Sequence, residues 1–106
     1  MSFFRQWRAV GAVAEFAAAD RKTFYTPDGL EIGVYRVADA YYAVSNTCPH
    51  AEASMVAGLV EDHEIECPLH GARFDLRTGA VIRPPATRGL KTYEVKVEGD
   101  RVWVKC

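Results

Sequence analysis

Two short segments of the chain combine residue types that bind metals. One reads Cys-Pro-His and contains Cys48 and His50; the other reads Cys-Pro-Leu-His and contains Cys67 and His70, with sixteen residues between the two segments. A mononuclear zinc finger usually collects its cysteines in one knuckle and its histidines in another. Here each segment offers one thiolate and one imidazole. This interleaving favours a two-iron cluster in which one iron binds Cys48 and Cys67 and the other binds His50 and His70.

The residues after the second segment support this interpretation. From Cys67 to Gly79 the chain reads Cys-Pro-Leu-His-Gly-Ala-Arg-Phe-Asp-Leu-Arg-Thr-Gly. This stretch resembles the second cluster loop of Rieske ferredoxins and the turn that follows it, and the resemblance extends over essentially the whole chain. It implies one Rieske-type [2Fe–2S] cluster, held by the cysteine and the histidine of each loop. A zinc ion bound by the same residues is the alternative.

The pattern of apolar residues predicts a mostly antiparallel β-structure. Several segments alternate with period two, as half-buried strands do: residues 31–37, 42–44, 93–97 and 101–104. Asp28-Gly29 and Gly99-Asp100 are turn pairs, and residues 38–40 are expected to reverse the chain between two strands. The family resemblance makes this an all-β, Rieske-like antiparallel sandwich or incomplete barrel, with a small cluster-binding subdomain of two loops.

The segment between the two ligand loops is harder to interpret. Residues 52–66 could form a short amphipathic helix, but Gly58 and the β-branched Val60 and Ile65 disfavour it. We therefore predict an irregular loop followed by a hairpin that turns at Asp62-His63. Such a hairpin would place Cys67 at the end of a strand.

Length and composition limit the kinds of function. With 106 residues, the chain is long enough for one domain, residues 1–106, in which the cluster-binding part covers about residues 46–86. A net charge of −1 with 25% charged residues gives no sign of nucleic-acid binding. Glu15 interrupts the apolar run 9–19, so neither a secretion signal nor a membrane span is predicted.

The cysteine count adds one further expectation. Of the three cysteines, two lie in the ligand segments, which leaves Cys106 as an incidental thiol or the site of an intermolecular disulfide. A disulfide framework is therefore not predicted. Reduced thiols and a metal motif fit a reducing compartment, and we expect a cytoplasmic monomer.

Four positions around the loops predict a low reduction potential. In respiratory Rieske proteins a disulfide ties the two loops, and a serine and a tyrosine donate hydrogen bonds to the cluster. The resemblance places Ala53 and Leu69 at the disulfide positions, Ala72 at the serine position and Phe74 at the tyrosine position. Without these donors more negative charge remains on the sulfur atoms, so the potential is expected near the low end of the Rieske range, roughly −150 mV.

These features together predict an electron carrier that is not itself an enzyme. The resemblance implies that it passes electrons from a flavin-dependent, NAD(P)H-oxidising reductase to the terminal oxygenase of an aromatic ring-hydroxylating dioxygenase system. One alternative is a small Rieske-type subunit of an assimilatory nitrite reductase. Another is a zinc-stabilised interaction module with no redox role.

Some residues near the loops allow two interpretations. Met55, Leu69 and Pro85 are apolar and are expected either to shield the cluster from water or to form a small docking patch. The acidic run 61–66 could steer partners, although a solvated face is the more common outcome. His63 lies within this run and is expected to be a solvated surface residue.

Overall fold

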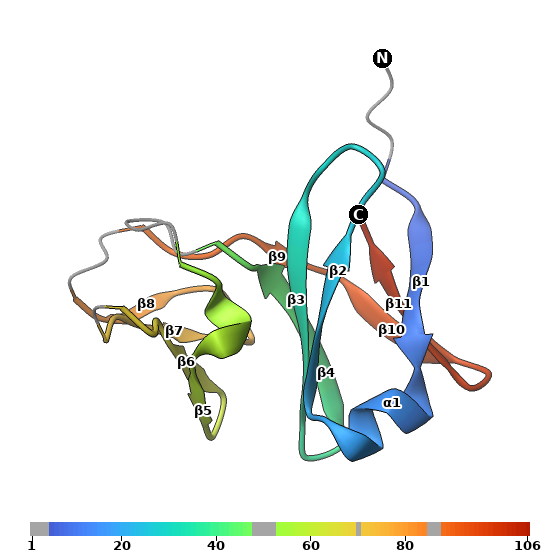
Figure 1. The fold of residues 1–106 in the computed structure, drawn as a ribbon, viewed down its shortest axis with the longest axis horizontal. Coiled ribbons are helices and arrows are strands. Elements are labelled where there is room, and N and C mark those ends of the chain that lie inside the picture. Colours follow the sequence, from blue (N-terminus) through green and yellow to red (C-terminus); the bar gives the residue numbers. More distant parts are fainter. Residues whose placement is uncertain (1–4, 48–52, 70, 85–87) are drawn as a thin grey trace.

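A computed structural model describes residues 5–47, 53–69, 71–84 and 88–106. Figure 1 shows two lobes beside each other. The larger, which we call the base, contains both the first and the last described residues. The smaller, which we call the small lobe, consists of the described residues between 53 and 84. The chain leaves the base after one strand and returns to it through another.

The base is built from two antiparallel sheets. Its elements are β1 (Trp7–Ala12), α1 (Val13–Ala18), β2 (Arg21–Tyr25), β3 (Glu31–Val37), β4 (Ala40–Ser45), β9 (Thr92–Tyr93), β10 (Val95–Glu98) and β11 (Arg101–Lys105). One sheet has the order β1-β11-β10 and the other β2-β3-β4-β9. Apolar side chains from both sheets meet in one core, which includes Val10, Ile32, Val34, Ala43, Val102 and Val104. The predicted antiparallel β-sandwich is confirmed.

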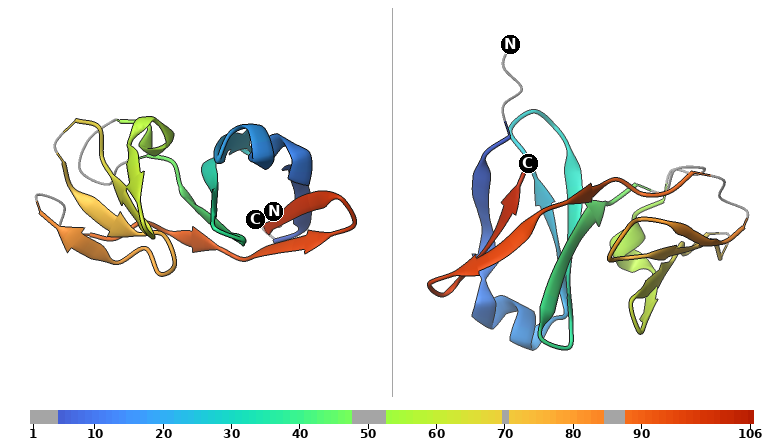
Figure 2. Two further views of the ribbon diagram at one scale, coloured as in Figure 1. Left: turned by 90° about the horizontal axis from the view of Figure 1, so that it is seen from below. Right: turned by 180° about the vertical axis from the view of Figure 1, so that it is seen from behind.

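The small lobe contains one further antiparallel sheet. The elements of the small lobe are η1 (Met55–Ala57), β5 (Leu59–Glu61), β6 (Glu64–Glu66), β7 (Arg73–Asp75) and β8 (Val81–Arg83). Its four strands pair in sequence order. Figure 2 shows this sheet to one side of the base from two more directions. Glu61 pairs with Glu64, so the hairpin turns at residues 62–63 as predicted. The segment before it forms the single turn η1 instead of a wholly irregular loop.

Strand β3 is more deeply buried than its alternating pattern predicts. Ile32 and Val34 contribute to the core of the base, while Tyr35 points to the other face and joins a second core with Met55, Cys67 and other residues of the small lobe. The sheet β2-β3-β4-β9 therefore packs against side chains on both of its faces. A two-residue period indicates which face a side chain occupies, but not whether another lobe covers that face.

Two elements of the base differ from the sequence-based expectation. The apolar run 9–19 contains most of β1 and the whole of α1. In α1, Phe16 is buried and contacts the ring of Tyr41 edge-on at 5.4 Å between centroids. The expected strand 93–97 is broken at Glu94. Before this residue β9 pairs with β4, and after it β10 pairs with β11, so the chain crosses from one sheet to the other. Of the helices in the described ranges, none has the length and apolar character required to span a bilayer.

The Tyr35 hydroxyl gives a first testable prediction. This side chain is 1% exposed, and its hydroxyl has no hydrogen-bond partner among the described residues. Burial raises the pKa of Tyr35, although Arg21 opposes the shift. The folded protein thus retains this proton where the unfolded chain loses it, so stability falls as the pH rises above about 10. Tyr35→Phe is expected to add about 1 kcal/mol to the unfolding free energy at pH 7 and to weaken this alkaline loss.

Urea unfolding at pH 7 and at alkaline pH measures both effects. Tyr25→Phe removes the same atom from a side chain that is 63% exposed, and this control variant should unfold like the unmodified protein at both pH values. A Tyr35→Phe variant less stable at pH 7 than the unmodified protein would contradict the prediction.

Candidate metal centre

Cys67 opens the turn that joins β6 to β7. Its backbone N–H donates to the carbonyl of Ala72 at 2.7 Å, and the N–H of Gly71 donates to the carbonyl of Cys67 at 3.1 Å. Gly71 has a φ of +76°, a conformation that costs glycine little and most other residues more. These bonds fix the backbone of Cys67 at the end of a strand, where the predicted hairpin was expected to place it.

The surroundings of Cys67 fit a thiolate ligand of an enclosed metal. The residue is 1% exposed and belongs to the second core together with Ala53, Met55, Ala72 and Phe74. In such an apolar environment an unpaired thiolate is unfavourable, whereas a thiolate bound to a cation is stabilised. A buried free thiol could also be purely structural. The interleaved ligand spacing of the two loops distinguishes the metal-binding interpretation from the structural one.

The other three predicted ligands, Cys48, His50 and His70, lie outside the described residues. In the ranges 5–47, 53–69, 71–84 and 88–106, no group of three or more histidine, cysteine, aspartate or glutamate side chains could hold a metal. The structure does place residues on both sides of the first loop. Thr47 and Ser54 form an antiparallel bridge, so the two ends of the segment that contains Cys48 and His50 lie together.

Gly58, which directly follows η1, lies against the strand that leads into Cys67. A Cβ atom on Gly58 would lie 1.9 Å from the carbonyl oxygen of Glu66. Only glycine allows these two backbones to approach so closely. This contact therefore fixes η1 relative to β6, the strand that directly precedes the predicted ligand Cys67.

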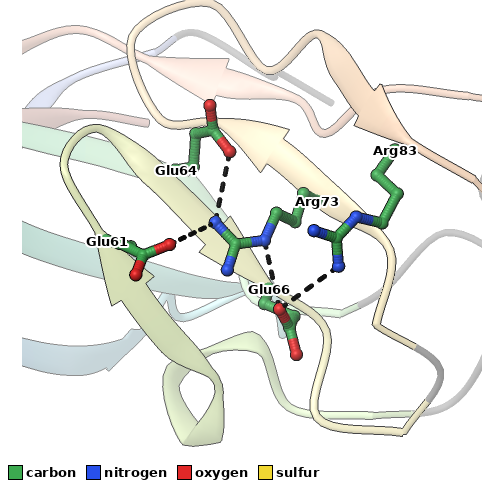
Figure 3. A network of polar contacts seen from close by, with 5 residues as sticks. All are labelled: Glu61, Glu64, Glu66, Arg73 and Arg83. Atoms are coloured by element: carbon green, nitrogen blue, oxygen red, sulfur yellow. Dashed lines mark hydrogen bonds and ion pairs between the residues drawn. The ribbon is translucent and has the colours of Figure 1, made fainter.

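Three carboxylates of the acidic run 61–66 pair with one arginine of the small lobe. Figure 3 shows three carboxylates around the guanidinium of Arg73: those of Glu61 at 3.0 Å, Glu64 at 3.3 Å and Glu66 at 3.1 Å. Arg83 lies 3.7 Å from Glu66. Burial lowers the pKa of Arg73, but hydrogen bonds to the three carboxylates outweigh it and raise the pKa above its usual value. This side chain is only 12% exposed, so the network mainly joins β5, β6, β7 and β8.

His63 differs from its sequence-based interpretation as a solvated residue, whereas the burial of Met55 excludes only the second of its two interpretations. His63 is only partly exposed, and its ring contacts Tyr42 edge-on at 5.8 Å between centroids, so it packs against the base instead of standing free in solvent. Met55 is 0% exposed and cannot contribute to a docking patch. Leu69 is 62% exposed and remains a candidate for such a patch, whereas Pro85 lies outside the described residues.

The four positions on which the low-potential prediction rests all lie within the described residues. Ala72 and Phe74 are both fully buried and carry no hydroxyl group. Ala53 is buried and Leu69 exposed, and neither side chain can form a disulfide. Both described cysteines, Cys67 and Cys106, are free. Cys106 is partly buried, and burial raises the pKa of its thiol, which keeps it protonated and unreactive near neutral pH.

The Rieske [2Fe–2S] domain matches residues 6–94, which include both ligand loops and most of the base. The chain belongs to the Rieske [2Fe–2S] domain family. Its cofactor is accordingly one Rieske-type [2Fe–2S] cluster, and a zinc-stabilised module is not supported.

Similar proteins include ferredoxin components of dioxygenase systems. The ferredoxin component of the naphthalene 1,2-dioxygenase system of Pseudomonas aeruginosa is 47% identical over 79 residues, which cover 74% of this chain and 76% of that protein. The ferredoxin of carbazole 1,9a-dioxygenase from Nocardioides aromaticivorans is 37% identical, with a TM-score of 0.86 over 94% of this chain and 97% of that one. A ferredoxin solved in complex with the oxygenase of carbazole 1,9a-dioxygenase is 33% identical, with a TM-score of 0.88 over 93% and 92% of the two chains.

Proposed function

We propose that this Rieske protein is the ferredoxin of an aromatic ring-hydroxylating dioxygenase system, and that it transfers single electrons to the terminal oxygenase. The observation that supports this most strongly is the extent of its similarity to ferredoxin components, which covers about three quarters of both chains at 47% identity. The solved complex of such a ferredoxin with its oxygenase supports the same partner here. In this function the protein is a carrier within an enzyme system and catalyses no reaction of its own.

The proposed cluster ligands are Cys48, His50, Cys67 and His70. When bound, the cluster takes up and releases one electron. Neutral imidazole ligands remove negative charge relative to four thiolates and thereby favour reduction. Cys67 retains the cluster from the buried side of the small lobe, and the apolar side chains around it exclude water. The remaining three ligands complete the set that the spacing of the two loops predicts.

The proposal includes a second protein partner and a cellular setting. Electrons enter from a flavin-dependent, NAD(P)H-oxidising ferredoxin reductase, and the carrier works as a monomer in the cytoplasm. Residues 1–106 form a single domain, and about residues 46–86 form its cluster-binding part. The separate sheet of the small lobe and its own core with Cys67 support this division.

The nitrite reductase alternative is less well supported. A small subunit of a nitrite reductase from Mycobacterium tuberculosis has a similar fold, with a TM-score of 0.83, but is only 22% identical. At that identity the likeness concerns the fold alone. The ferredoxin components are much more similar in sequence, and the complete set of cluster ligands in this chain agrees with a redox role.

Purification followed by an electron-transfer assay tests the proposed function. The purified protein should be brown, contain two irons and two sulfides per chain, and give on reduction the EPR spectrum of a cluster with mixed histidine and cysteine ligation. Mixed with a ferredoxin reductase and the oxygenase of a naphthalene dioxygenase system, it should support NAD(P)H-dependent hydroxylation in place of their own ferredoxin. A colourless protein with one zinc, or a brown one that the reductase cannot reduce, would refute the proposal.

The reduction potential provides a separate prediction. The unmodified protein should have a midpoint potential of roughly −150 mV, because hydroxyl donors are missing at Ala72 and Phe74. The double variant Ala72→Ser with Phe74→Tyr is expected to raise it by about 50–100 mV, a fraction of the range that Rieske centres span. Protein-film voltammetry measures both values. As a control, Phe24→Tyr adds a hydroxyl in the base and should leave the potential unchanged. A midpoint above about +100 mV for the unmodified protein would contradict the prediction.

A further inference from the structure

Asn46 makes an unusual number of hydrogen bonds at the point where the chain leaves the base. It is 2% exposed. Its backbone N–H donates to the carbonyl of Glu31 at 3.0 Å, and its backbone carbonyl accepts from the N–H of Met55 at 2.7 Å. Its side-chain Oδ1 accepts from the N–H of Val56 at 2.9 Å, and Nδ2 donates to the Ser54 hydroxyl at 2.9 Å. All of its polar groups are therefore paired.

These bonds hold the two ends of the first ligand loop together. Asn46 precedes Cys48 by two positions, while its partners in residues 54–56 follow the loop. The adjacent bridge between Thr47 and Ser54 joins the same two segments of the chain. The polypeptide between them, which contains Cys48 and His50, must start and end at this closure. We call residues 46–47 and 54–56 the neck.

The neck is also fixed to the rest of the protein. On the side of the base, Arg21 Nη1 donates to the carbonyl oxygens of Val56 at 3.1 Å and Gly58 at 2.6 Å. On the side of the second loop, Gly58 packs against the carbonyl of Glu66, directly before Cys67. A displacement of the neck would thus be transmitted to both ligand loops.

The side chain required at position 46 is narrowly defined. Oδ1 satisfies a backbone N–H at the start of η1, and Nδ2 reaches a hydroxyl on the other end of the loop. An apolar residue would leave the Val56 N–H without this acceptor at a partly buried position, which is costly. A carboxylate could still accept from Val56 and could receive a hydrogen bond from Ser54, but it would add a negative charge near Cys48.

We propose that Asn46 is a positioning residue for the cluster, which fixes the first ligand loop by closing its neck. The inference rests on the proposed function, because it takes Cys48 and His50 as ligands. Asn46 touches no iron in this proposal. It limits the separation of the loop ends, and so determines how tightly the cluster is retained and how uniform its ligand geometry is.

Three variants test the proposal. Asn46→Ala should release iron to a chelator about tenfold faster than the unmodified protein, as the loss of one to two hydrogen bonds predicts, and should broaden the EPR lines. Asn46→Asp should restore slow release but lower the midpoint potential, because its charge opposes electron uptake. Thr26→Ala is the control: Thr26 is also a buried polar residue, 6% exposed, and its hydroxyl accepts from the Leu30 N–H at 2.9 Å in the turn between β2 and β3.

Thr26→Ala should lower the melting temperature while leaving iron release and the EPR spectrum unchanged, provided that release is measured well below every unfolding transition. Equal release rates for Asn46→Ala and the unmodified protein would overturn the proposal, as would equally fast release from Thr26→Ala. If Asn46→Ala does not fold, Ser54→Ala decides, because it removes only the acceptor of the Asn46 Nδ2 bond at an exposed residue, and release as slow as that of the unmodified protein overturns the inference. An unmodified protein without a cluster would instead refute the proposed function. This result differs from every result that overturns the inference about Asn46, so the two failures are distinguishable.

Discussion

Replacement of Cys67 by alanine is expected to reduce the iron and sulfide content of the purified protein at least about tenfold. The substitution removes one of two predicted thiolates at a position that is 1% exposed, where neither water nor an external thiol can easily substitute for it. The visible absorption and the EPR signal of the reduced state should disappear with the iron. Metal analysis and spectroscopy of protein reconstituted with iron and sulfide measure the effect.

Cys106→Ala provides the matched control. Cys106 is the other cysteine among the described residues, and it is free and only partly buried. It lies on the base, where its backbone pairs with Gln6, and the same substitution there should leave the iron content unchanged. If Cys67→Ala retained a full cluster, the ligand assignment of the second loop would be wrong, whatever the behaviour of Cys106→Ala.

Gly58→Ala is expected to be strongly destabilising. The new Cβ would lie 1.9 Å from the Glu66 carbonyl oxygen, and both groups belong to backbones that are held by neighbouring hydrogen bonds. Either η1 or β6 must shift, at a cost of about 3 kcal/mol in the free energy of unfolding. Because β6 leads into Cys67, cluster release should also accelerate. Urea unfolding of the reconstituted protein and the rate of iron release measure the two effects.

Gly11→Ala separates this close contact from a general effect of replacing glycine. Gly11 lies in β1, and a Cβ there would meet only side-chain atoms, the nearest being Lys22 Nζ at 3.2 Å and Glu15 Oε2 at 3.3 Å. Both are ends of flexible side chains that can move. This variant should unfold within about 0.5 kcal/mol of the unmodified protein. Similar stabilities for Gly58→Ala and Gly11→Ala would show that the contact with Glu66 is not restrictive.

The sequence by itself was sufficient for the features that depend on neighbouring residues. Period-two alternation identified β3 and β11, and turn pairs located the reversals at Asp28-Gly29 and Gly99-Asp100. The hairpin at residues 62–63 followed from the same local rules. The spacing of cysteine and histidine in two loops identified the cluster type, because ligand order along the chain distinguishes this site from a zinc finger.

The tertiary structure decided what depends on residues far apart in the chain. Glu94 divides one expected strand between two sheets, and the small lobe covers Tyr35. Both features follow from pairings between distant strands, which local alternation does not encode. The same holds for the acidic run, three of whose carboxylates pair with Arg73 from another strand. Asn46 has no distinctive sequence pattern. Its side-chain partners at the neck lie eight to ten residues further along the chain, so its proposed role depends on the two ends of the first ligand loop lying side by side.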